Sequence, residues 1–103
     1  MKPETPKNQY ALSVYLLLER YHEGVTMVDA MRHYHFHKFT NRLRDVEKGR
    51  EDKLKIQRLP ITKKNRFGHT HTFTNFKSLA PRNYLVNLIS KLNREGLKKN
   101  DAA

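Results

Sequence analysis

Residues 26–48 read TMVDAMRHYHFHKFTNRLRDVEK, a pattern that predicts two short helices joined by a polar turn. Thr26 followed by Asp29 three residues later is typical of the capping box that begins a helix. We therefore expect a first helix over residues 27–33. The polar residues 33–35 then interrupt the apolar periodicity, which predicts a turn.

The second helix of this unit is expected over residues 37–48. Its apolar residues recur at intervals of three, four and three, which makes one narrow apolar face. They are Phe36, Phe39, Leu43 and Val46. The opposite face is polar and largely basic, and it holds His37, Lys38, Asn41, Arg44, Asp45 and Lys48. Such a helix buries its apolar face and leaves the polar face to solvent or to a ligand.

The chain before residue 26 predicts one further helix. Residues 9–23 carry apolar side chains at helical spacing over a wide arc, which places this helix at the centre of the core. Gly24 is expected to end the helix as a C-terminal cap. Residues 1–8 hold two prolines and mixed charges, so we expect them to form a flexible arm.

The chain after residue 53 predicts a β-hairpin. Leu54–Ile61 and His69–Phe76 are rich in Leu, Ile, Thr and Phe, which favours strands, and Thr62–Gly68 is the expected turn. Pro60 lacks a backbone N–H, so the first strand should lie at an edge or end near that residue.

A last helix is expected over residues 80–94. Ser78 is a candidate N-cap, Pro81 suits the first turn, and Gly96 should end the helix. Residues 95–103 are expected to form a flexible tail. The fold class predicted by this order of elements is α+β, with one domain over residues 9–94.

Charge is the strongest pointer to function in this chain. The 103 residues carry a net charge of +11, and residues 53–94 hold ten Lys and Arg side chains with no Asp or Glu. A basic hairpin without counter-charge indicates an anionic partner, of which nucleic acid is the first candidate. The chain has no cysteine and no apolar run long enough to span a bilayer. We therefore expect no disulfide, no membrane association and a cytoplasmic location.

The two-helix unit and the basic hairpin together resemble the winged helix-turn-helix family of DNA-binding proteins. The resemblance is carried by Thr26–Lys48 and Leu54–Phe76, and with the first helix it covers roughly residues 9–78. Size and composition are similar to those of small regulators encoded by phages and mobile elements. The turn His33-Tyr34-His35-Phe36 lacks the usual small residue, which leaves the start of the recognition helix open by one or two residues.

The resemblance implies a sequence-specific protein for double-stranded DNA, a nucleoid-associated transcriptional regulator. Helix 37–48 would enter the major groove, where Asn41 matches adenine and Arg44 matches guanine. The wing, residues 62–68, would lie on the backbone or in a minor groove. The residues implied to contact DNA are His37, Lys38, Thr40, Asn41, Arg44, Lys48, Lys63, Lys64, Asn65 and Arg66.

Other interpretations of the same residues stay open. The charge would also suit RNA or the acidic surface of a partner protein, in which case the chain would be a small adaptor or inhibitor. The apolar stripe of helix 80–94 or of helix 9–23 would suit a homodimer. Phe67 would either fold back as a plug of the hairpin or wedge into nucleic acid.

Enzymatic activity, a metal site and a cofactor are not expected. No nucleophile–base motif is recognisable, so we predict no catalytic residue. Histidines alternate at positions 33, 35 and 37 and at positions 69 and 71. In a helix, residues two apart do not share a face, and no cysteine is present to complete a tetrahedral site.

Overall fold

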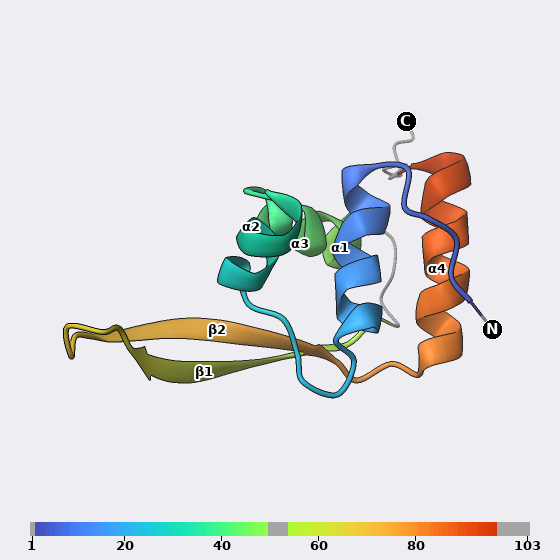
Figure 1. Cartoon of the computed structure of the whole chain (residues 1–103). Helices are drawn as coiled ribbons and strands as arrows, with labels where there is room; N and C mark the ends of the chain where they lie inside the picture. The colour runs from blue at the N-terminus through green and yellow to red at the C-terminus, as the bar shows by residue number, and fades with distance from the viewer. Residues whose placement is uncertain (1, 50–53, 97–103) are drawn as a thin grey trace.

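A computed structural model describes residues 2–49 and 54–96 of the chain. The elements are α1 (Gln9–Glu19), α2 (Met27–Tyr34), α3 (Phe39–Gly49), β1 (Ile56–Lys64), β2 (Thr70–Ser78) and α4 (Arg82–Glu95). The helices gather at one end, and the antiparallel β1–β2 hairpin runs beneath α2 and α3 and projects past them (Figure 1). This is the predicted α+β, winged-helix layout, and that prediction is confirmed.

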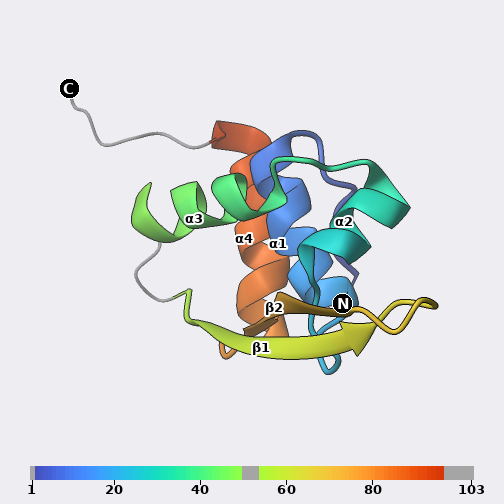
Figure 2. The same ribbon diagram turned by 90° about the vertical axis from the view of Figure 1, so that its left-hand side faces the viewer.

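The core lies where α1 meets α3 and α4. The helices α1 and α4 pack side by side, and α3 crosses over them, as Figure 2 shows in a view toward the tip of the hairpin. The ring of Phe39 on α3 meets the ring of Phe76 on β2 edge-on, with 5.6 Å between centroids, so the hairpin is part of the same core. The apolar stripe of α4 is buried here, and it consists of Leu85, Val86, Leu88, Ile89 and Leu92.

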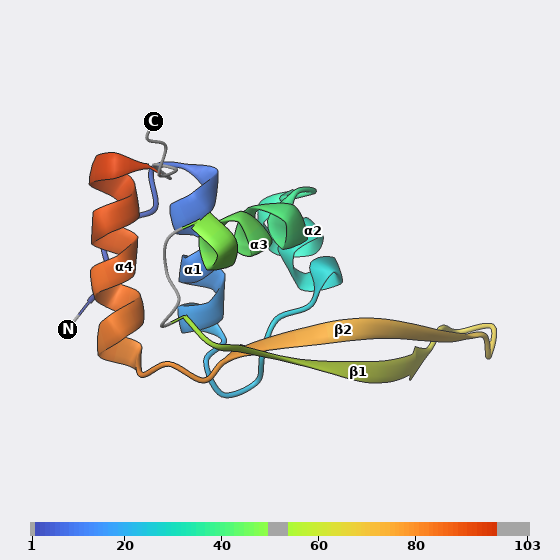
Figure 3. The same cartoon turned by 180° about the vertical axis from the view of Figure 1, so that it is seen from behind.

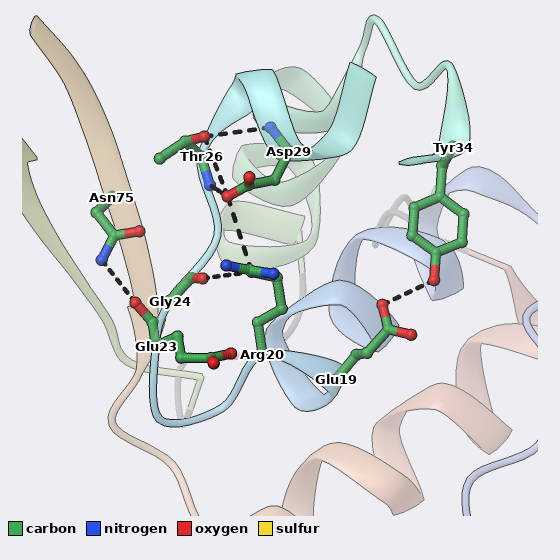
Figure 4. Close-up of polar contacts among 8 residues, drawn as sticks. All are labelled: Glu19, Arg20, Glu23, Gly24, Thr26, Asp29, Tyr34 and Asn75. Carbon is green, nitrogen blue, oxygen red and sulfur yellow. Dashed lines mark hydrogen bonds and ion pairs between the residues drawn. The ribbon is translucent and has the colours of Figure 1, made fainter. Parts of the chain in front are cut away.

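The first helix ends earlier than expected, at Glu19 instead of residue 23. Residues 20–23 form turns, and Gly24 is not the helix cap. Gly24 has φ +85°, and a Cβ there would lie 2.3 Å from the side-chain amide of Asn75. That amide donates to the carbonyl of Glu23 (Figure 4). Gly24 is therefore needed because the chain passes close to the hairpin, which local sequence does not reveal.

The helix α2 begins at a complete capping box, as predicted. The Thr26 hydroxyl accepts a hydrogen bond from the Asp29 N–H, and the Asp29 carboxylate accepts one from the Thr26 N–H. Arg20 of the preceding turn lies 3.7 Å from that carboxylate and donates to the Gly24 carbonyl (Figure 4). Directly before Thr26, Val25 exchanges two backbone hydrogen bonds with Phe76, which ties the start of α2 to β2.

The helix α2 ends in a left-handed residue, His35, with φ 52°. The N–H of His35 donates to the Met31 carbonyl, and the N–H of Phe36 donates to the Ala30 carbonyl. The bond from His35 to Met31 is that of the αL motif, a helix end at which glycine is the usual residue. Phe36 is buried beyond it, and α3 starts only at Phe39, two residues later than expected. The observed start at residue 39 lies within the one or two residues that the sequence left open.

The hairpin is longer and its turn tighter than expected. The strands pair from Ile56–Ser78 to Lys64–Thr70, so residues 62–64 belong to β1 instead of to the turn. Pro60 sits within β1, which has a partner strand on one side only, as an edge position requires. The turn itself is Asn65 to Gly68, closed by a hydrogen bond from the Gly68 N–H to the Asn65 carbonyl.

The start of α4 also differs from the expectation. Ser78 is not its N-cap, because the Ser78 hydroxyl bonds the backbone of Ala80 in both directions. Pro81 occupies the N-cap position, without a side-chain cap, and the helix begins at Arg82. The predicted end is confirmed, with Gly96 at the C-cap and φ 66°.

The arm before α1 lies along α4. Asn8 caps α1 through a bond from the Ala11 N–H and also donates to the Leu92 carbonyl. The side chain of Asn93 bonds the Lys7 N–H and the Glu4 carboxylate. Hydrogen bonds from Ser90 and then from Asn93 hold the pKa of Glu4 below its ordinary value. Of the expected flexible tail, residues 97–103 lie outside the described residues.

Candidate nucleic-acid interface

The exposed face of α3 holds three of the predicted DNA-contacting residues. Asn41, Arg44 and Lys48 are exposed and follow one another at intervals of three and four, so they lie on one side of the helix. Phe39 and Val46 are buried on the other side. The structure therefore brings these three polar side chains together on one face.

Both acids of α3 are paired with arginines. The Asp45 carboxylate lies 3.1 Å from the Arg42 guanidinium. The Glu47 carboxylate accepts two hydrogen bonds from Arg58 of β1, one of them at 3.2 Å. The hydrogen bonding to Glu47 raises the pKa of Arg58 above its ordinary value. The negative charge of the helix is therefore compensated within the fold.

Arg42 and Arg44 differ in whether their guanidinium groups have partners within the fold. Arg42 is held by Asp45, by Gln9 and by the ring of Tyr10, over which its guanidinium lies at 5.5 Å. Within residues 2–49 and 54–96, Arg44 makes no ion pair or hydrogen bond through its side chain. Of the two arginines near the middle of α3, only Arg44 is therefore available to a ligand.

A groove of about 460 Å³ separates α3 from the hairpin. Thr40 and Arg44 line it from α3, and Arg58, Thr72 and Thr74 line it from the strands. The views from opposite sides show α2 and α3 lying over the same face of the hairpin (Figures 1 and 3). We call this feature the α3–wing groove. Its polar lining consists of hydroxyl and guanidinium groups, which are hydrogen-bond donors suited to phosphate oxygens, and Met27, Phe73 and Phe76 add apolar surface.

The predicted wing residues do not crowd into one turn. Lys63 pairs with His71, and Lys64 pairs with Thr70, so successive lysines point to opposite faces of the strands. Arg66 is exposed in the turn. Lys63 and Lys64 also line a second, smaller crevice of about 200 Å³ beside α2, to which Arg32 contributes. The wing therefore presents cations on several sides.

Asn65 has a structural role in the turn. Its side-chain oxygen accepts hydrogen bonds from the N–H groups of Phe67 and His69, at 2.9 and 3.0 Å. Its amide nitrogen lies 3.3 Å from the His71 ring. The Asn65 side chain therefore shapes the wing tip, and its contact with DNA stays a prediction.

The remaining predicted residues lie near α3 but not all on it. His37 and Lys38 are exposed in the turn before the helix, and Thr40 is half-buried in its first turn. The sequence did not point to Arg58, Thr72 and Thr74 of the groove. The available signal was the alternation along β2. Residues on one face of a strand recur at every second position, so Thr72 and Thr74 lie on the same face as Phe76.

The described part of the chain offers neither a cluster of metal ligands nor a membrane-spanning helix. There, no three His, Asp or Glu side chains come together as metal ligands. The same residues contain no helix with the length and apolar character that crossing a membrane requires.

Comparison with protein-family models, with curated proteins and with solved structures finds no significant match for this chain. The fold assignment therefore rests on element order, strand register and packing. Any function has to be argued from the geometry and charge of the interface.

Proposed function

We propose that this protein binds double-stranded DNA, with α3 in the major groove and the wing on the neighbouring backbone. The observation that carries the proposal is the unpaired Arg44, which shares an exposed helix face with Asn41 and Lys48 beside the α3–wing groove. Arginine and asparagine have forked donor groups that match guanine and adenine edges. Lysine adds a contact to phosphate.

Electrostatics support the same ligand. The acids of α3 are neutralised by Arg42 and Arg58, and the chain holds no Asp or Glu between Asp52 and Glu95. A duplex that approached α3 and the two strands would meet cations and hydroxyl groups on these elements, whose carboxylates are paired. Release of counterions from the phosphates would then supply most of the affinity.

The shape of the molecule favours duplex DNA over duplex RNA. An exposed α-helix fits the wide major groove of B-DNA, whereas the major groove of A-form RNA is too deep and narrow for side chains to read. The tip of the wing lies six residues beyond Thr74, which lines the groove, a span of about 20 Å at strand spacing. Half a turn of B-DNA is roughly 17 Å, so the tip reaches the next minor groove.

The test is selection of bound duplexes from a random pool, followed by mobility-shift titration of Arg44→Ala against Arg42→Ala. Both variants remove one positive charge from α3, but Arg42 is paired with Asp45, whereas Arg44 has no ion pair among residues 2–49 and 54–96. We expect Arg44→Ala to weaken binding by about 1–3 kcal/mol and to relax the sequence preference at one position. Arg42→Ala should leave the preference unchanged.

Asn41→Ala and Lys64→Ala complete the series. Loss of base preference is expected for the first, and a uniform loss of affinity for the second. Wild-type binding by all of Asn41→Ala, Arg44→Ala and Lys64→Ala would reject the proposal. Preference for structured RNA in competition would favour an RNA-binding protein, and a protein partner retained after nuclease treatment would favour an adaptor. A consensus site upstream of a transcription start would support regulation of transcription.

A further inference from the structure

Phe67 is an apolar side chain that the fold leaves in solvent. It lies at the tip of the wing with 75% of its surface exposed, more than any other large hydrophobic residue in the described chain. Leu79, at the opposite end of the hairpin, follows with 62%. The expectation that Phe67 folds back as a plug of the hairpin was therefore wrong. An exposed phenylalanine at the end of a projecting hairpin suggests a ligand that covers it.

The turn is built without the side chain of Phe67. The Asn65 side chain accepts from the Phe67 and His69 N–H groups, and the Asn65 N–H donates to the His69 carbonyl at 2.9 Å. Gly68 supplies the left-handed residue, with φ +85°. These bonds involve only backbone atoms and the Asn65 amide. The conformation of the turn therefore does not depend on the Phe67 ring.

The surroundings of the ring indicate which ligand it meets. The Arg66 guanidinium lies 5.6 Å from the ring centroid, and Lys63 and Lys64 end the preceding strand. No carboxylate occurs between Asp52 and Glu95. A ligand complementary to this tip has to offer anionic groups for the cations and a flat apolar surface for the Phe67 ring. Nucleic acid has both, since phosphates border the stacked bases.

We propose that Phe67 is a wedge that enters between two base pairs in the minor groove and bends the duplex. The inference rests on the proposed DNA binding and deepens it. With α3 in the major groove, the tip lies at the distance of the adjacent minor groove, and Arg66 and Lys64 reach the phosphates on either side. A wedge there unstacks one step and bends the duplex by roughly 20–90° toward the major groove. Pyrimidine–purine steps unstack most easily, so a central TA step is the preferred target.

The bend is measured by energy transfer between dyes at the two ends of a duplex of about 30 base pairs with a central TA step, at low salt. Wild type should bring the ends closer. Phe67→Ala should bind with about tenfold lower affinity and leave the duplex straight, whereas Phe67→Leu should keep most of the bend because leucine also wedges. Leu79→Ala is the control, since it removes another exposed apolar group, 62% exposed, away from the tip.

The outcomes separate the wedge from DNA binding itself. Equal bending by wild type and Phe67→Ala, with DNA still bound, overturns the wedge and leaves the proposed function standing. Failure of wild type to bind any duplex overturns both. Circular dichroism of Phe67→Ala is expected to match wild type, because the turn does not depend on the ring.

A second measurement uses the absence of tryptophan from the chain. In Phe67→Trp, the single indole reports on the wing tip alone. Insertion into the stack should quench its fluorescence and protect it from acrylamide on duplex DNA. Unchanged emission on saturating duplex contradicts the wedge, and protection only on single-stranded DNA replaces it with stacking on an unpaired base.

Discussion

Individual residues explain why the helix-turn-helix unit has an unusual turn. His35 adopts the left-handed conformation that ends α2, where glycine is the common choice. A side chain in this region costs about 1–2 kcal/mol, and the cost is offset here by the buried anchor Phe36 and by two backbone hydrogen bonds. The absence of glycine made the turn hard to place from sequence.

Replacement of His35 by glycine should therefore stabilise the protein. We expect His35→Gly to raise the free energy of unfolding by about 0.5–1 kcal/mol. This gain is the backbone strain that glycine relieves, reduced by the conformational entropy that glycine adds to the unfolded chain. Urea titration measures the change. His37→Gly is the control: His37 has no positive φ, so the same replacement should destabilise the protein. A loss of stability in His35→Gly would contradict the assignment of strain.

Tyr34 links stability to alkaline pH. Burial, followed by the hydrogen bond that its hydroxyl donates to Glu19 at 2.7 Å, raises the pKa of Tyr34 to about 12 (Figure 4). Because the unfolded chain holds the ordinary pKa near 10, this contribution is complete below about pH 10 and is lost as pH rises toward 12.

Tyr34→Phe should remove that component of the pH dependence. Unfolding in urea at pH 9 and at pH 11 gives the difference for each protein, and we expect a smaller loss of stability at pH 11 in the variant than in wild type. Tyr15→Phe keeps the Tyr34–Glu19 bond and should retain the wild-type loss. Identical losses in wild type and Tyr34→Phe would show that this hydrogen bond does not couple to pH.

At the scale of elements, the hairpin is tied to the helices at its base and free at its tip. The Phe39–Phe76 contact, the Val25–Phe76 backbone bonds and the Arg58–Glu47 pair all lie in the basal half. The tip of the hairpin projects beyond α2 and α3 (Figure 3). This division lets the core set the position of the wing while its cations remain exposed.

Under the proposed DNA binding, position along the hairpin should decide how a lysine affects affinity. Lys64→Ala should lower the slope of log affinity against log salt by about 1, because the proposal places the distal wing on phosphates. Lys77→Ala removes the same charge from the basal half and should leave the slope near the wild-type value. Binding measured over a range of salt concentrations tests both, and equal slopes for the two variants would exclude the wing as a phosphate contact.

At the scale of the whole molecule, the core accounts for the apolar surface that suggested a dimer. The apolar stripe of α4 packs against α1, and neither helix has an exposed large hydrophobic residue among those described. The expectation of a homodimer through helix 80–94 or helix 9–23 rested on that stripe and loses its support.

We accordingly expect a monomer that binds an unsymmetrical site. Sedimentation equilibrium should give a mass near 12.3 kDa. The duplexes selected from a random pool should lack two-fold symmetry, because half-site symmetry mirrors the symmetry of the protein. A palindromic consensus or a doubled mass would point to a dimer through some other surface.

Sequence alone determined the features that depend on neighbours within a few positions. The capping box of Thr26 and Asp29, the apolar face of α3 and the end of α4 at Gly96 are such features, because their hydrogen bonds and periodicity are local. The absence of Asp and Glu from residues 53–94 could also be seen without a structure, because charge is counted along the chain. These features were enough to predict a winged-helix layout and the face that carries Asn41, Arg44 and Lys48.

Tertiary structure decided what depends on residues distant in the chain. Arg42 and Arg44 look equivalent in sequence, but contacts with α1 and Asp45 occupy Arg42 and leave Arg44 free. Gly24 reads as a helix cap until Asn75 approaches it from β2. Phe67 is exposed because Asn65 and Gly68 complete the turn without it. In each case, the environment of the side chain depends on how segments pack in three dimensions, and the local spacing of residues does not reveal that packing.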